Sequence, residues 1–167
     1  DEFPDIDKFK LFNGNLTVFK QVMFYFKLNL RVRNFDHDSG DGLWPGTRML
    51  NFRLFKKINN VQKIRNFKAK KYGWWRFNKP RLNIINYGGW HFRFFGSSKN
   101  LKHELENRAI GRGENILSSY SESDINNIIT NQLPFTTEEE RYEVYPLSKM
   151  PDFVKLNKEK YTDSLIV

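Results

Sequence analysis

Cysteine is absent from this chain of 167 residues. A disulfide framework, a thiol nucleophile and a cysteine-ligated zinc site are therefore excluded. Long hydrophobic runs are absent as well, since no stretch approaches the roughly 20 apolar residues that a helix needs to cross a bilayer. A domain of this length buries roughly 70% of its unfolded surface, so we expect one domain held together by an apolar core.

Acidic residues are the scarcer of the two charged types. The chain has 28 lysines and arginines against 19 aspartates and glutamates, a net charge of +9, and 16 phenylalanines. A basic, aromatic-rich domain favours an anionic partner: a nucleic acid, a phosphate-bearing small molecule or a membrane surface. An ordinary surface rich in lysine and asparagine fits the same composition, so charge alone does not decide.

Three stretches have the residue pattern of β-strands. Residues 22–32 alternate strictly between apolar and mixed side chains, which predicts one long strand with an apolar face and a partly polar face. Residues 48–55 alternate in the same way and predict a second strand, joined to the first as a long-looped hairpin. Residues 82–87 are rich in isoleucine and end in tyrosine, as in a third strand.

Helices are expected towards the C-terminus. Ser97 and Ser98 can cap a helix through residues 98–109, which residues 111–115 would interrupt, and residues 121–124 resemble a capping box ahead of three isoleucines at helical spacing. Pro151 can open a last helix, with core contacts expected at Phe153, Leu156 and Leu165. Strands and helices together predict an α/β fold with a mixed sheet.

The segment Gly88-Gly89-Trp90-His91 follows the third predicted strand. Two glycines permit a sharp change of direction, so we expect them to present Trp90 and His91 to a pocket between this strand and the next helix. Neutral imidazole is a metal ligand and a hydrogen-bonding group. A histidine buried in the core and satisfied by the backbone fits the same spacing.

Acidic residues occur at two places that could bind a hard cation. Asp1 and Glu2 stand just before Pro4, and a cluster that includes Asp41 lies in the predicted loop 34–42. Mg²⁺ and Mn²⁺ take oxygen ligands from one or two carboxylates and fill the other positions with water or phosphate. A solvated acidic terminus and an ordinary exposed turn are the alternatives.

Residues 56–76 are basic and end in aromatic residues that include Trp74 and Trp75. Cations interleaved with aromatic rings can bind single-stranded nucleic acid, because bases stack on the rings while lysines meet the phosphates. The same tryptophans could stack on sugars or pack in the core. A nucleic-acid-binding module is therefore the alternative function.

The order of these motifs resembles glycosyltransferase family seventeen, the β-1,4-mannosyl-glycoprotein 4-β-N-acetylglucosaminyltransferases. Asp1-Glu2-Phe3-Pro4 is similar to the end of that family's Asp-x-Asp-Glu-Ile-Pro motif. Trp44-Pro45-Gly46-Thr47 resembles its Trp-x-Gly-Thr step, and Gly89-Trp90-His91 resembles its Gly-Trp-His signature. The similarity extends over nearly the whole chain, from the aromatic strand at residues 24–29 to the isoleucine-rich helix at residues 125–131.

The resemblance implies that residues 1–167 are the C-terminal catalytic portion of one GT-A-like domain, truncated at its N-terminus and inactive or weakly active alone. The implied reaction is transfer of a sugar, N-acetylglucosamine from UDP-GlcNAc, to a hydroxyl of a glycan acceptor with inversion. No nucleic-acid partner is then expected. The upstream region could associate with a membrane: animal members are Golgi membrane proteins, whereas this composition is typical of a bacterial or viral relative that is cytoplasmic or membrane-associated.

Site residues follow from the same resemblance. Asp1, Glu2 and His91 would hold Mn²⁺ or Mg²⁺ against the diphosphate of the donor. The implied contacts to donor or acceptor are Trp44, Trp90, His91 and Arg93. Inversion also needs a carboxylate that deprotonates the acceptor, and the candidates for this base are Asp41, Glu104 and Glu114.

Overall fold

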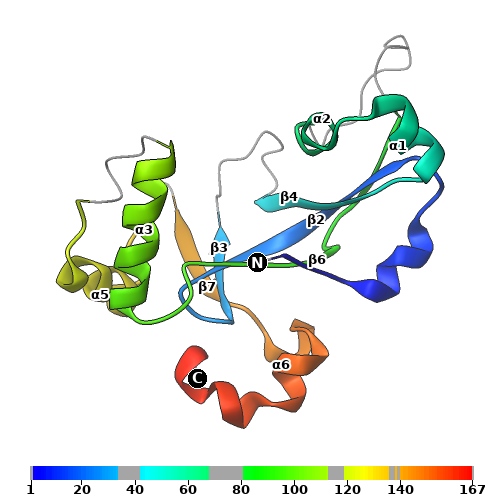
Figure 1. Cartoon of the computed structure of the whole chain (residues 1–167). Helices are drawn as coiled ribbons and strands as arrows, with labels where there is room; N and C mark the ends of the chain where they lie inside the picture. The colour runs from blue at the N-terminus through cyan, green and yellow to red at the C-terminus, as the bar shows by residue number, and fades with distance from the viewer. Residues whose placement is uncertain are drawn as a thin grey trace. The chain divides into compact units, whose positions relative to one another are not determined.

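The protein has a mixed α/β fold built on a seven-stranded mixed sheet, as predicted (Figure 1). The computed structural model describes residues 2–33, 42–67, 81–112, 119–135, 138 and 140–166. The strands are β1 (Glu2–Pro4), β2 (Leu16–Tyr25), β3 (Leu30–Arg33), β4 (Leu43–Met49), β5 (Leu82–Ile85), β6 (Gly89–Arg93) and β7 (Arg141–Val144). The α-helices are α1 (Phe52–Ile58), α2 (Val61–Arg65), α3 (Ser98–Arg112), α5 (Glu122–Asn131) and α6 (Asp152–Leu156). Short 3₁₀ helices are η1 (Ile6–Leu11), η2 (Leu147–Lys149) and η3 (Lys158–Ser164).

The sheet has the order β1-β6-β2-β3-β7, and β4 and β5 also pair with β2. The chain divides into two compact units. The first comprises residues 1–23 and 35–91, the second residues 24–34 and 92–167. Strands β2 and β6 begin in the first unit and end in the second.

Strand β2 is the central strand, and all ten of its residues are buried. In the first unit β4 pairs with it in antiparallel fashion and β5 in parallel fashion. Strands with both faces covered carry apolar residues at consecutive positions, as β2 does. The predicted partly polar face is therefore wrong: Met23 and Tyr25 are as fully buried as Phe24 between them.

The predicted strand over residues 22–32 is in fact a hairpin. The chain leaves β2 after Tyr25, turns at Phe26 with a φ of 64°, and returns as β3, with Phe24 opposite Arg31. The apolar alternation continues through the turn because Phe26 is itself a core residue of the second unit, with its ring 5.3 Å from that of Phe135.

The predicted strand over residues 48–55 is also wrong, because a helix begins inside it. Strand β4 ends at Met49, and the side chain of Asn51 accepts a hydrogen bond of 2.7 Å from the backbone N–H of Leu54, which caps α1. Capping by asparagine satisfies an N–H group that a helix start would otherwise leave open. Strands β2 and β4 do pair in antiparallel fashion, but β3 lies between them in the chain, so the predicted hairpin of these two strands is wrong.

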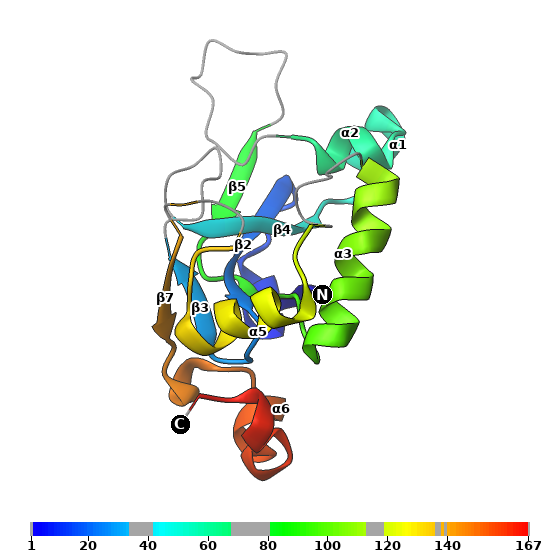
Figure 2. The same ribbon diagram turned by 90° about the vertical axis from the view of Figure 1, so that its left-hand side faces the viewer.

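The helices α3 and α5 of the second unit confirm the predicted ones, and they pack against each other (Figure 2). Helix α5 has the predicted capping box at Ser121 and Asp124. Helix α3 buries Leu101 and Leu105 but continues to Arg112, so the predicted interruption at residue 111 is wrong. No helix in the described ranges is long and apolar enough to cross a membrane.

The last helix begins after Pro151, as predicted, but its predicted core contacts are wrong. Helix α6 has five residues and gives way to η3, so the apolar spacing of a long helix does not apply. Phe153 and Leu156 are exposed and Leu165 is half-buried, whereas Met150 and Val154 are buried.

Candidate functional site

The carboxylate of Glu2 is the centre of a polar cluster in the first unit. Its two oxygens accept hydrogen bonds from different groups of β4: Oε1 from Trp44 Nε1 at 3.2 Å, and Oε2 from Thr47 Oγ1 at 3.3 Å. Strand β1 pairs with β6 so that Glu2 lies opposite His91. Side chains directly opposite each other in an antiparallel pair lie on the same face of the sheet.

The stacking of His91 on Trp44 completes this cluster. The two rings lie 5.1 Å apart between centroids with an interplanar angle of 24°. His91 is buried, with 8% of its surface exposed. Residues 2, 44–47 and 91 are far apart in the sequence, and the pairing of β1 with β6 and of β4 with β2 brings them together.

A β-bulge explains how Trp44 and Thr47 reach the same carboxylate. Residues three apart in a regular strand point to opposite faces. Between the pairs Val18↔Arg48 and Lys20↔Pro45, however, β4 uses one more residue than β2. A bulge of this kind changes the direction of the side chains that follow it, and here it returns Thr47 to the face of Trp44.

Gln21 of β2 orients the hydroxyl of Thr47. Its side chain is fully buried, and Nε2 donates to Thr47 Oγ1 at 3.2 Å. An amide N–H can only donate, so the threonine oxygen accepts this bond and its own proton is directed to Glu2. The result is a hydrogen-bond chain from Gln21 through Thr47 to Glu2.

Gly46 makes room for Gln21. A Cβ atom at this position would lie 2.0 Å from Gln21 Oε1 and 2.5 Å from its Cδ, far inside van der Waals contact. No described group forms a hydrogen bond with that buried Oε1 atom. The absence of a side chain at Gly46 thus leaves the space that the Gln21 amide occupies.

Arg48 holds the segment ahead of Thr47 in place. Its Nη1 donates to the carbonyl oxygens of Pro45 at 3.0 Å and Gly46 at 2.8 Å. Burial lowers the pKa of the Arg48 guanidinium, and the negative charge of Glu2 opposes that shift. The Arg48 guanidinium is thus close enough to the Glu2 carboxylate for their charges to interact.

The predicted turn does follow the third strand, β5, but the predicted presentation of Trp90 and His91 by that turn is wrong, and the two glycines serve close packing. Trp90 and His91 lie within β6 itself. Gly89 has a φ of +147°, and a Cβ there would lie 2.3 Å from the carbonyl oxygen of Phe3 in β1. A Cβ at Gly88 would lie 2.8 Å from the Cβ of Phe19 in β2.

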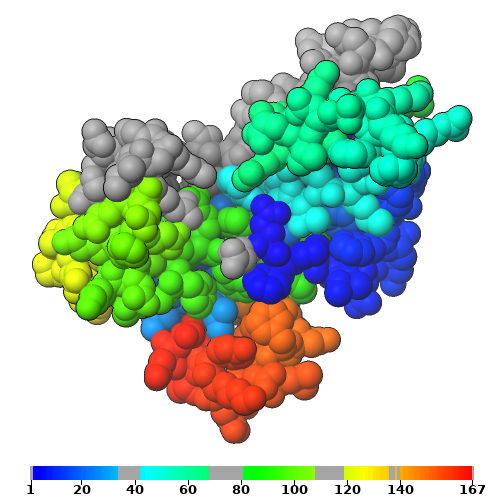
Figure 3. Space-filling model, viewed as in Figure 1, coloured from blue at the N-terminus to red at the C-terminus, as the bar shows by residue number. Residues whose placement is uncertain are grey.

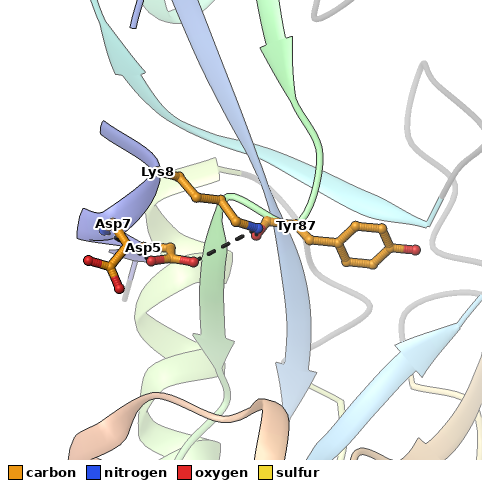
Figure 4. Close-up of polar contacts among 4 residues, drawn as sticks. All are labelled: Asp5, Asp7, Lys8 and Tyr87. Carbon is orange, nitrogen blue, oxygen red and sulfur yellow. Dashed lines mark hydrogen bonds and ion pairs between the residues drawn. The ribbon is translucent and has the colours of Figure 1, made fainter. Parts of the chain in front are cut away.

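The turn before β6 is also tied to the N-terminal segment. Lys8 of η1 donates a hydrogen bond to the carbonyl oxygen of Tyr87, and its ammonium lies 3.8 Å from the Asp5 carboxylate (Figure 4). Asp5 in turn caps η1 by accepting from the N–H of Asp7 at 3.2 Å. These contacts keep β1 beside β6, and so Glu2 beside His91.

The structure unites only part of the predicted site. Glu2, Trp44 and His91 come together, whereas Trp90, next to His91 in β6, points to the opposite face. Arg93 belongs to the second unit, where its guanidinium lies over the rings of Tyr25 and Phe94 at 5.9 and 4.7 Å.

The remaining candidates lie in the second unit or outside the described residues. Glu104, a candidate base, is half-buried on α3 in the second unit. The other two candidate bases, Asp41 and Glu114, and the candidate metal ligand Asp1 lie outside the described residues.

Sequence reasoning missed the supporting residues Gln21, Thr47 and Arg48 as parts of the site. For Gln21 a signal existed, since a polar residue inside the apolar run of β2 must find a hydrogen-bond partner. No pattern pointed to the bulge that re-aims Thr47, because a one-residue mismatch between paired strands is visible only once both are aligned.

A metal ion would find few protein ligands here. Among the described residues, no group of three or more histidine, aspartate and glutamate side chains is placed to hold one. Glu2 could supply a carboxylate oxygen and His91 a nitrogen, and Mn²⁺ or Mg²⁺ commonly completes its shell with water and substrate phosphates. Among the described residues the cluster thus contains one carboxylate and one imidazole that could act as ligands.

Comparison of the chain with protein-family models, with curated proteins and with solved structures finds no significant match.

Proposed function

We propose that the chain is the catalytic portion of a metal-dependent, inverting glycosyltransferase with a GT-A-like fold, which transfers N-acetylglucosamine from UDP-GlcNAc to a glycan hydroxyl. One observation supports this proposal most. Three motifs that resemble those of glycosyltransferase family seventeen, at Glu2, Trp44–Thr47 and His91, meet around one carboxylate. Three motifs of one site must lie close together in the folded chain. If each motif only stabilised its own strand, their proximity would not be required.

Each residue of the cluster has a role in this reaction. Glu2, with Asp1 beside it in sequence, would hold Mn²⁺ or Mg²⁺, and His91 would add a nitrogen ligand or a hydrogen bond to a phosphate. The bound ion would neutralise the charge of the departing diphosphate. Trp44 and Thr47 orient the Glu2 carboxylate, and Gln21 orients Thr47.

Metal-dependent donor binding tests the proposal directly. The chain is titrated with Mn²⁺, and binding is monitored as the loss of the electron paramagnetic resonance signal of free Mn²⁺. We expect a Mn²⁺ site whose affinity for the ion increases when UDP is added. Glu2→Gln should weaken binding of Mn²⁺ in the presence of UDP by about tenfold or more, since it removes a charged ligand. Glu159→Gln, a matched change at an exposed carboxylate of η3, should leave it unchanged.

Two results would contradict the proposal. One is an absence of Mn²⁺-dependent UDP binding by the unsubstituted chain. The other is an equal effect of Glu2→Gln and Glu159→Gln, which would mean that general surface charge attracts the ion. Binding is the more direct readout, because it tests the metal and donor site without requiring an acceptor.

A further inference from the structure

Positive charge is concentrated in one part of the chain. Residues 42–103 contain fifteen lysines and arginines and not one aspartate or glutamate. The rest of the chain therefore has more acidic than basic residues, even though the whole carries a net charge of +9. Such an asymmetry indicates a surface for an anionic partner more strongly than the net charge does.

The helices α1 and α2 display part of this charge on a defined scaffold. Asn51 and Asn60 cap the starts of the two helices through their side chains, and Asn59 ends α1 in the left-handed conformation. Ile64 is buried and anchors α2. Five basic side chains on this scaffold are exposed: Arg53, Lys56, Lys57, Lys63 and Arg65.

Two large apolar side chains stand among these cations. Phe52 is 67% exposed and Val61 is 68% exposed, each at the first position of its helix. Figure 3 shows the atoms of α1 and α2 (teal) at the surface of the molecule. A segment that binds at the surface of a bilayer places its exposed apolar groups among the acyl chains. Its lysines and arginines then lie at the anionic headgroups.

We propose that the α1–α2 face, defined as Phe52, Arg53, Lys56, Lys57, Val61, Lys63 and Arg65, binds the surface of a membrane that contains anionic lipids. Charge complementarity fits any anionic partner, and the exposed apolar pair favours a lipid surface over a nucleic acid. Val61 has neither an aromatic ring on which a base could stack nor a polar group that could form a hydrogen bond with a base. The Phe52 ring lies beside that of Phe55, with the ammonium of Lys56 5.0 Å from its centroid.

Vesicle co-sedimentation of the whole chain tests the proposal. We expect binding to vesicles of phosphatidylcholine mixed with phosphatidylserine in equal parts, and none to phosphatidylcholine alone. The charge variant Lys56→Gln/Lys57→Gln and the apolar variant Phe52→Ser/Val61→Ser should each weaken binding on the order of tenfold, since cations and inserted apolar groups both contribute. Lys158→Gln/Lys160→Gln on η3 is the matched control for lost charge and should bind as the unsubstituted chain does.

The four substituted side chains of α1 and α2 are exposed, so all variants should keep the circular dichroism spectrum of the parent chain. An equal loss in the two charge variants would overturn the proposal, because it would show attraction by net charge alone. Unchanged binding of Phe52→Ser/Val61→Ser would overturn it as well. So would binding of a single-stranded oligonucleotide, weakened by Lys56→Gln/Lys57→Gln, without any binding to vesicles. None of these outcomes depends on Glu2, so this test is independent of the transferase proposal.

Discussion

Trp44 and Thr47 stand three residues apart in β4 and yet donate to the two oxygens of one carboxylate, that of Glu2. A regular strand would point these side chains to opposite faces. The bulge opposite β2 supplies the extra residue that brings them to the same side. The cluster thus depends on a local irregularity of the sheet, and the residues that maintain this irregularity are the ones to test.

Removal of the Thr47 hydroxyl should destabilise the fold by about 1–3 kcal/mol, because it leaves the buried Gln21 Nε2 without its acceptor. Thr47→Val makes this change with little change of shape. Urea unfolding followed by circular dichroism measures the free energy of unfolding. Thr47→Ser keeps the hydroxyl and should retain most of the stability, so an equal loss in both variants would contradict the hydrogen-bond chain.

Gly46→Ala should also destabilise the protein, by about 1–3 kcal/mol, because the added methyl group overlaps Gln21 Oε1. The clash requires the glutamine, so it should largely disappear in the double variant with Gln21→Ala. A double-mutant cycle in urea should then give a coupling of about 0.5–3 kcal/mol between the two positions. Additive effects would mean that Gly46 is needed for another reason.

Gly89 and Gly96 have similar φ angles, but substitution by alanine should be less well tolerated at Gly89 because the backbone of β1 lies against it. Gly89 and Gly96 have φ values of +147° and +124°, both unfavourable for other residues. A Cβ at Gly89 meets the Phe3 carbonyl oxygen at 2.3 Å, whereas at Gly96 the nearest atom is 3.5 Å away, in Asn100.

Gly89→Ala should therefore reduce the free energy of unfolding by at least about 1 kcal/mol more than Gly96→Ala. Both substitutions place a Cβ atom on a residue with a positive φ, but only the one at Gly89 also causes an overlap, with the Phe3 carbonyl oxygen. Chemical denaturation of the two variants under the same conditions provides the comparison. Equal losses would show that dihedral strain dominates at both positions.

Alkaline pH should weaken the second unit through Tyr142. Burial raises the pKa of the Tyr142 phenol, and the carboxylate of Glu140, which accepts its hydrogen bond at 3.0 Å, raises it further. In the unfolded chain a tyrosine loses its proton near pH 10, whereas the folded chain retains it. The unfolded state then binds fewer protons, so stability falls as the pH rises above about 10.

Thermal unfolding measured from pH 8 upwards should show this decline, and Tyr142→Phe should make it shallower because the phenol is gone. The comparison concerns the slope with pH, since the substitution also removes the bond to Glu140 and lowers stability at every pH. Tyr87→Phe, at a half-exposed tyrosine, is the control and should keep the slope of the parent chain. The same slope in all three proteins would contradict the prediction.

Local signals in the sequence were sufficient for much of the second unit. The capping box of α5 and the leucine spacing of α3 act within a few residues of the chain, so no distant contact was needed to predict those helices. The apolar pattern of residues 22–32 predicts a single strand because Phe26 is buried even though it lies in a turn. The alternation of apolar residues indicates which side chains are buried, and side chains in a turn after a strand can be buried as well.

The α/β class, the helices α3 and α5 and the residue types of the Glu2 cluster follow from the sequence alone. Which of those residues meet depends on how the strands pair. Strand pairing placed His91 opposite Glu2, the bulge in β4 turned Thr47 towards the same carboxylate, and β6 carried Trp90 to the other face. The physical reason is that register and bulges depend on hydrogen bonds between strands far apart in the chain, which no window of the sequence contains.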